Sequence, residues 1–204
     1  MLYEIGDKVL DEWVITRTIG EGSYGKVVEI ERNEFGLSMK SALKIISIPG
    51  NNSEIRAVMG EGIDNKSITS YFYGFVEEII KEIAIMSELK GHTNIVTYED
   101  HRVIPHQDHI GWDILIRMEL LTSLLDYSEE HEITEQTVIK LGTDILTALE
   151  VCQKYHVVHR DIKPENIFVD HTGHFKLGDF GIARTIEKTT GGLSKKGTES
   201  YMAP

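Results

Sequence analysis

The sequence predicts an α+β fold in two parts, the first built mainly of β-strands and the second mainly of helices. Up to about residue 120, short β-branched runs alternate with turns and are interrupted by one long amphipathic pattern. After that point, helical periodicity dominates the sequence. At 204 residues with 41% hydrophobic side chains, the chain suits either one domain of ordinary size or two small lobes that share a cleft.

The charge balance and the cysteine content exclude several classes of protein. The chain has 33 acidic and 21 basic residues, and the formal charge of −12 disfavours binding to nucleic acid or to anionic lipid. A single cysteine, Cys152, excludes an intramolecular disulfide. Neither a signal peptide nor a run of about 18 apolar residues is visible, so we expect a cytoplasmic protein with no membrane segment in this chain. An anchor or sensor after residue 204 is left open.

Five strands are expected before residue 120. β-Branched runs predict strands at 13–20 and 26–32, joined by a glycine-rich turn, and a third strand at 41–46. Two further strands lie within 94–104 and 112–120. The polar stretch over 47–67 contains four Gly or Pro residues and indicates an inserted loop with a short helix. A tolerated surface loop is favoured there over a contact for a regulator.

Two helices carry clear apolar stripes. The first is expected from about Thr69 to Lys90, with a stripe of Val76, Ile79, Ile83, Met86 and Leu89. The second follows a Thr134 cap and has a stripe of Val138, Leu141, Ile145, Ala148, Leu149 and Cys152. These stripes predict which face of each helix is buried.

The glycine-rich turn is a candidate phosphate site. It comprises Gly20, Glu21, Gly22, Ser23, Tyr24 and Gly25, and glycines at this spacing let main-chain N–H groups approach phosphate oxygens. A dinucleotide-binding fold uses similar spacing, but it needs a helix after the last glycine and an acidic residue about 20 positions on. Here a strand follows, and the charged residue is Lys44.

Lys44 stands in an otherwise apolar strand. If its ammonium group is buried, it needs a counter-charge. The following helix offers Glu77, Glu78, Glu82 and Glu88, of which Glu82 lies among the positions that face the protein body. An equally weighted alternative is that Lys44 extends to solvent from an edge strand.

The most specific segment is His159-Arg-Asp-Ile-Lys-Pro-Glu-Asn166, followed by Asp179-Phe-Gly181. Phosphoryl transfer needs a group to align a hydroxyl, oxygen ligands for Mg²⁺ and cations for the developing charge. The two segments together contain side chains for all three of these roles. One Asp in a loop is usually a turn former, but the combined pattern is not explained in that way.

With these motifs in order, the sequence resembles the eukaryotic-like protein kinase family over essentially its whole length, and the long 47–67 connection is similar to that of some bacterial members. The resemblance implies a protein-kinase-like two-lobed fold. Its parts are an N-lobe (1–118) with an antiparallel five-stranded sheet and the family's αC helix, a hinge (119–121), and the first part of a mainly helical C-lobe (122–204). Since family members continue past the APE motif, we expect truncation there, an exposed apolar face on the C-lobe and little activity of the fragment.

The resemblance also implies ATP as substrate and Mg²⁺ as cofactor. The nucleotide would contact Gly20, Glu21, Gly22, Ser23, Gly25, Val27, Ala42, Lys44, Met118, Glu119, Leu121 and Phe168. Lys44 would hold the α- and β-phosphates while paired with Glu82. Asn166 and Asp179 would bind Mg²⁺. Asp161 would orient the attacking hydroxyl and accept its proton, and Lys163 would steady the phosphoryl group.

Lys163, two residues after Asp161, is typical of Ser/Thr kinases, so the implied partners are protein substrates in a signalling role. We expect autophosphorylation at Thr189, Thr190 or Ser194, in trans between two copies of the protein. Thr198 is expected in the substrate-binding loop. An unregulated Ser/Thr-rich loop is the alternative. A pseudokinase and a small-molecule kinase are the rival functions; the intact catalytic positions disfavour the first, and the final GT…YMAP segment disfavours the second.

Overall fold

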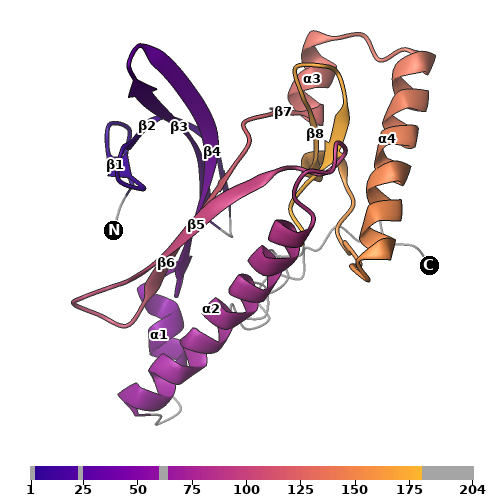
Figure 1. The fold of residues 1–204 in the computed structure, drawn as a ribbon. Coiled ribbons are helices and arrows are strands. Elements are labelled where there is room, and N and C mark those ends of the chain that lie inside the picture. The colour runs from indigo at the N-terminus through magenta and orange to yellow at the C-terminus, as the bar shows by residue number, and fades with distance from the viewer. Residues whose placement is uncertain (1–2, 23–24, 60–63, 181–204) are drawn as a thin grey trace.

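The structure is a computed structural model that describes residues 3–22, 25–59 and 64–180. Its N-terminal part contains β1 (Lys8–Val9), β2 (Trp13–Gly22), β3 (Gly25–Glu34), β4 (Leu37–Ile48), α1 (Asn52–Met59), α2 (Asn65–Glu88), β5 (Tyr98–Pro105) and β6 (Trp112–Met118). Its C-terminal part contains β7 (Thr122–Ser123), α3 (Leu124–Glu130), α4 (Glu135–Lys154), a 3-10 turn (Pro164–Asn166), β8 (Ile167–Val169) and β9 (Phe175–Leu177). Figure 1 shows the two parts side by side, joined near β7.

The N-terminal sheet is antiparallel, with the strand order β1-β2-β3-β4-β6-β5. All five expected strands are present. The sixth, β1, was not predicted, because two residues are too few to show an alternating pattern. Side chains alternate between the two faces, so that Leu115 packs in one apolar cluster while Ile114 and Ile116 pack in the other.

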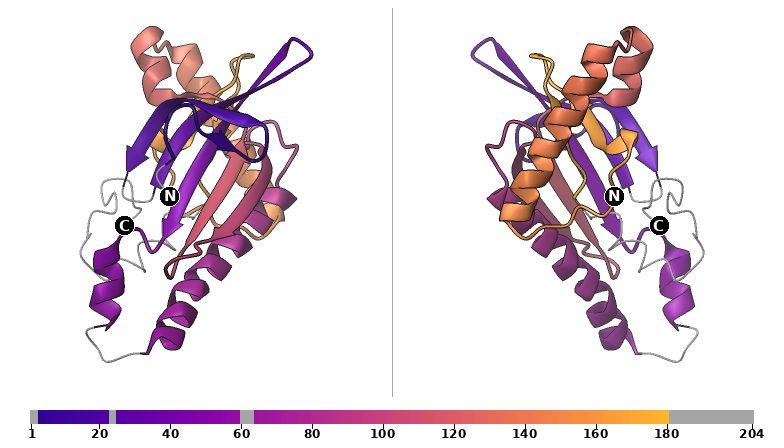
Figure 2. Two further views of the ribbon diagram at one scale, coloured as in Figure 1. Left: turned by 90° about the vertical axis from the view of Figure 1, so that its left-hand side faces the viewer. Right: turned by 90° about the vertical axis from the view of Figure 1, so that its right-hand side faces the viewer.

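Helix α2 covers one face of this sheet, as the two side views in Figure 2 show. Its buried side chains are Ile68, Phe72, Val76, Ile79, Ile83 and Met86. The helix begins four residues earlier than predicted, because the Asp64 carboxylate accepts hydrogen bonds from the N–H groups of Lys66 and Ser67. In the stretch over 47–67, α1 (Asn52–Met59) is the expected short helix, while β4 continues to Ile48 and α2 begins at Asn65.

Helix α4 begins at its predicted cap, where Thr134 Oγ1 accepts a hydrogen bond from Thr137 N. Ala148 and Cys152 are buried as expected, but Val138 is 55% exposed, so the predicted stripe was wrong at its first position. Ile139 and Leu146 are also exposed, so α4 presents several apolar side chains to solvent. Within the described ranges, no helix is long and apolar enough to cross a membrane.

Candidate active site

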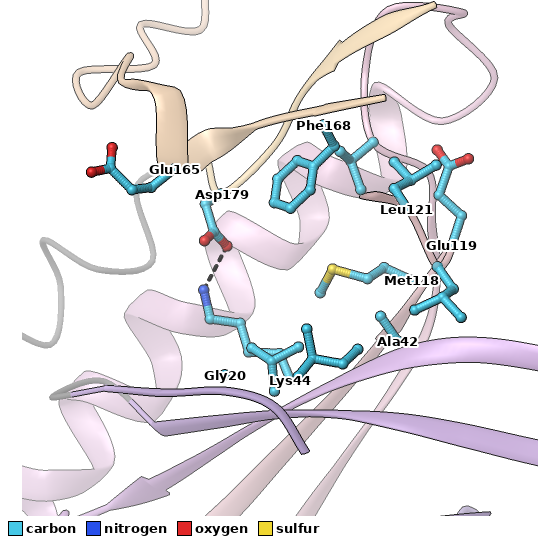
Figure 3. A pocket seen from close by; sticks show the side chains of 13 residues that line it. Gly20, Ala42, Lys44, Met118, Glu119, Leu121, Glu165, Phe168 and Asp179 are labelled. Atoms are coloured by element: carbon cyan, nitrogen blue, oxygen red, sulfur yellow. Dashed lines mark hydrogen bonds and ion pairs between the residues drawn. The ribbon is translucent and has the colours of Figure 1, made fainter. Parts of the chain in front are cut away.

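A cleft lies between the two parts and is lined from both sides. Its lining residues are Ile19, Gly20, Val27, Ala42, Lys44, Val96, Met118, Glu119, Leu120, Leu121, Glu165, Phe168 and Asp179. Figure 3 shows side chains of the N-terminal sheet facing Phe168 and Asp179 of the other part across this space. Eight of the thirteen were predicted as nucleotide contacts, and Asp179 was predicted as a metal ligand. The cleft thus brings together residues that are up to 160 positions apart, a difference taken from Ile19 and Asp179.

The glycine-rich turn forms the end of the β2–β3 hairpin. The strands pair Glu21 with Lys26 and Gly22 with Gly25. Gly25 has a φ of 128°, and a Cβ there would come within 2.1 Å of the Ile45 carbonyl oxygen. Only glycine fits this position, since both its backbone conformation and the space around it exclude a side chain. This requirement fixes the turn close to β4, which carries Lys44.

Apolar side chains form the inner walls of the cleft. Ala42 and Met118 are register partners on β4 and β6, so they lie next to each other at the back. Phe168, on β8, faces them from the C-terminal part. Gly178 is needed behind this ring, because a Cβ there would lie 2.7 Å from Val96 and 3.0 Å from Phe168. The walls suit a flat aromatic group held between two apolar faces.

Among the described residues that line the cleft, Lys44 is the only cation, and its side chain is buried at 8% exposure. Its Nζ donates a hydrogen bond to Asp179 Oδ1 at 2.5 Å. Burial raises the pKa of Asp179, whereas the charge and hydrogen bond of Lys44 lower it, and the pKa ends below its usual value. The sequence predicted Glu82 as the partner of Lys44. The carboxylate within ion-pair distance in the structure is that of Asp179, and the Lys44–Glu82 pair stays a prediction.

Two predicted catalytic side chains, Asp161 and Lys163, meet the predicted metal ligand Asn166 in the loop before β8. Lys163 Nζ lies 3.0 Å from Asp161 Oδ2. Asn166 Nδ2 donates to the same Oδ2 at 2.9 Å and to the Asp161 main-chain oxygen at 2.8 Å. The amide nitrogen and the lysine therefore orient the carboxylate of Asp161 from two directions. Since the nitrogen of Asn166 faces Asp161, its amide oxygen is the atom of this side chain that could bind a cation.

His159 joins this loop to the segment that carries Asp179. It is 3% exposed, and burial lowers the pKa of its ring. In the neutral ring, Nε2–H donates to the Gly178 carbonyl at 2.8 Å and Nδ1 accepts from Asp161 N at 3.4 Å. The ring also packs edge-on against Phe180 at 4.8 Å between centroids. His159 thus connects the main chain at Asp161 to the main chain next to Asp179. The sequence analysis did not predict this role.

Asn166 and Asp179 offer an amide oxygen and a carboxylate, which are the donor types that Mg²⁺ prefers. Among the described residues, no group of three or more His, Cys, Asp or Glu side chains could hold a metal ion by itself. The donor types of Asn166 and Asp179 fit a magnesium site that nucleotide phosphates would complete, since Mg²⁺ commonly takes only one or two protein carboxylates.

Some predicted residues lie outside the described ranges. Ser23 and the activation-segment candidates Thr189, Thr190, Ser194 and Thr198 belong to this group. Conversely, the sequence analysis did not identify Ile19, Val96, Leu120 and Glu165 as cleft residues. Ile19, Leu120 and Glu165 adjoin predicted residues in the sequence, and that adjacency was a usable signal. Val96 carried none, because only the packing of the two parts brings it to the cleft.

The chain matches the family model for the protein kinase domain over residues 13–204. It therefore belongs to the protein kinase family. It is 29% identical over 203 residues to serine/threonine-protein kinase 32B of Homo sapiens, covering 95% of this chain and 41% of that protein. It is 30% identical over 207 residues to serine/threonine-protein kinase Nek2 of Homo sapiens, covering 95% of this chain and 40% of that protein. The chain thus spans about two fifths of the length of these relatives.

Proposed function

We propose that this chain carries the catalytic site of a Ser/Thr protein kinase, which transfers the γ-phosphoryl group of ATP to Ser or Thr hydroxyls of proteins. The observation that carries the proposal is the ion pair between Lys44 and Asp179, which both line the cleft. His159 links the main chain at Asp161 to Gly178, next to Asp179. The named relatives, which are Ser/Thr protein kinases, support the same reaction class.

Each residue has a part in this reaction. Asp161 accepts the proton of the attacking hydroxyl as its oxygen bonds to the γ-phosphorus and the bond from phosphorus to the β–γ bridging oxygen breaks. Lys163, 3.0 Å from Asp161, supplies positive charge near the transferring group. Asn166 and Asp179 would hold Mg²⁺, which when bound neutralises charge on the phosphate oxygens. Lys44, which pairs with Asp179 in the structure, would bind phosphate oxygens of ATP.

The proposal includes the finer predictions from the sequence. These are an N-lobe over 1–118, a hinge over 119–121 and the first part of a C-lobe over 122–204, together with ATP and Mg²⁺ as substrate and cofactor. Several other predictions also remain. They are autophosphorylation in trans at Thr189, Thr190 or Ser194, the bacterial-type connection over 47–67, a cytoplasmic location and a lack of nucleic-acid binding.

Labelled ATP and Mg²⁺ test the function in the full-length protein and its Asp161→Asn variant. We expect label on Ser or Thr residues of protein for the wild type. The variant should bind ATP about as tightly but lose transfer by about 10²-fold or more. Nucleotide binding without transfer by the wild type would instead support a pseudokinase. Label in small metabolites but never in protein would support a small-molecule kinase.

A further inference from the structure

An ion pair that the sequence analysis did not predict joins Glu119 of the cleft lining to Lys176, which lies outside the lining. Lys176 Nζ lies 2.9 Å from both carboxylate oxygens of Glu119. The two side chains are only 9% and 22% exposed. Glu119 Oε1 also accepts a hydrogen bond from Thr97 N at 2.6 Å. We refer to Glu119, Lys176 and Thr97 together as the hinge clamp.

The hinge clamp joins three segments that are distant in the sequence. Glu119 lies in the short connection from β6 to β7, Thr97 directly precedes β5, and Lys176 is the middle residue of β9. Glu119 N also donates to the Thr97 carbonyl at 3.1 Å, so these two residues exchange two hydrogen bonds. Next to the clamp, Val96 N donates to the Leu177 carbonyl at 3.0 Å. The clamp thus ties the connection between the two parts to a strand of the C-terminal part.

Because the ion pair between Glu119 and Lys176 is largely removed from water, both side chains have little conformational freedom. An ammonium group that is removed from water needs an anion and well-aligned acceptors, and both oxygens of Glu119 supply them to Lys176. The Glu119 carboxylate therefore has little freedom to take another rotamer. Because its amide N–H is already used by Thr97, the main-chain group that Glu119 can offer to a ligand in the cleft is its carbonyl. The clamp fixes that carbonyl in one place.

We propose that Lys176 is a positioning residue for the nucleotide. It acts through Glu119 to hold the hinge main chain in the geometry that binds the edge of the base. Lys176 therefore sets the affinity for nucleotide and leaves the rate of the chemical step nearly unchanged. This inference rests on the proposed function, because it assumes that the cleft binds ATP. The plain alternative is that the pair only stabilises the fold.

The test compares Lys176→Met with the wild type in the full-length protein. We expect KM for ATP and Kd for ADP to rise about tenfold, while kcat changes by less than about twofold. Lys176→Arg keeps a cation that can bind both carboxylate oxygens, so it should recover most of the affinity. Lys154→Met is the matched control, since Lys154 forms an exposed ion pair with Glu150 on α4 and should leave both constants unchanged.

Amide hydrogen exchange separates positioning from general stabilisation. In Lys176→Met, exchange should increase at residues 118–121 and stay unchanged in the middle of α4. An unchanged Kd for ADP in a folded Lys176→Met protein would overturn the proposal, as would faster exchange throughout the C-terminal part. If this variant does not fold, Glu119→Gln takes its place, because it keeps the bond from Thr97 and removes the charge; an unchanged Kd would again overturn the proposal. A wild type that binds no nucleotide would contradict the proposed function itself.

Discussion

Lys44 Nζ lies 2.5 Å from Asp179 Oδ1, although 135 positions separate the two residues in the sequence. The pair crosses the cleft from β4 of the N-terminal part to the segment after β9. It links the residue expected to bind phosphates with one expected to bind metal. The relative position of the two parts therefore sets the distance between the expected phosphate-binding group and the expected metal ligand.

Replacing Lys44 by Met should raise the pKa of Asp179 and slow phosphoryl transfer. Without the ammonium group, burial is no longer offset, so the pKa of Asp179 should rise from its lowered value towards or above that of an ordinary carboxyl. Carboxyl carbon NMR during a pH titration would measure this rise. We expect phosphoryl transfer to fall by about 10²-fold or more. An unchanged pKa of Asp179 would contradict the assigned role of the ion pair.

Gly25→Ala should destabilise the glycine-rich turn even without nucleotide. The left-handed φ of 128° and the approach of the Ile45 carbonyl to 2.1 Å from the new Cβ both oppose the substitution. We expect a loss of about 1–3 kcal/mol in the free energy of unfolding, measured by chemical denaturation. Gly20→Ala is the matched control, because no atom lies within 4 Å of its Cβ position. Equal losses in the two variants would show that the close approach to β4 does not matter.

Asp144 supports the strand that leads to Asp179. Its Oδ2 accepts hydrogen bonds from Phe175 N at 2.8 Å and from Lys140 Nζ at 2.9 Å. Asp144→Ala leaves the buried Phe175 N–H without this acceptor, so we expect a loss of about 1–3 kcal/mol in stability by denaturant unfolding. Lys140→Ala leaves the bond from Phe175 in place and should cost less, about 0–1 kcal/mol. The reverse order would contradict this explanation.

Glu29 should make the free energy of unfolding depend on pH in the acidic range. Its carboxylate is 6% exposed and binds Lys40 Nζ at 2.8 Å and Arg17 Nε at 2.7 Å. The hydrogen bonds from Lys40 and Arg17 lower the pKa of Glu29 to about 2. Because the pKa is lower in the folded state, this stabilisation is complete above the unfolded value near 4.5 and is lost as the pH falls towards 2.

The measurement compares denaturant unfolding of the wild type and Glu29→Gln between pH 7 and pH 3. At pH 7 the variant should be less stable by about 1–3 kcal/mol, and the difference should shrink below about pH 4.5. Glu150→Gln removes a carboxylate from an exposed pair and serves as the control, with a small effect expected. A difference that stays constant with pH would show that Glu29 acts through packing alone.

Local signals in the sequence were strong enough to predict most elements. The apolar spacing of α2 and the Thr134 cap of α4 depend on neighbours within a few residues, and both are present in the structure. The stripe of α4 failed at Val138, because periodicity shows which side chains share a face but not how far the covering surface extends. The short strand β1 was not predicted for a related reason, since its pairing with β2 is a tertiary contact.

The sequence by itself determined the residue types of the site. The glycines of the β2–β3 turn, the Asp161–Asn166 loop and Asp179 could all be named, because their chemistry and spacing are local. Only the tertiary structure decided which groups touch. It paired Lys44 with Asp179, placed His159 between two carboxylate segments and buried Lys176 against Glu119. These contacts join residues far apart in the chain, and no periodic pattern records them, because their geometry depends on how the two parts pack across the cleft.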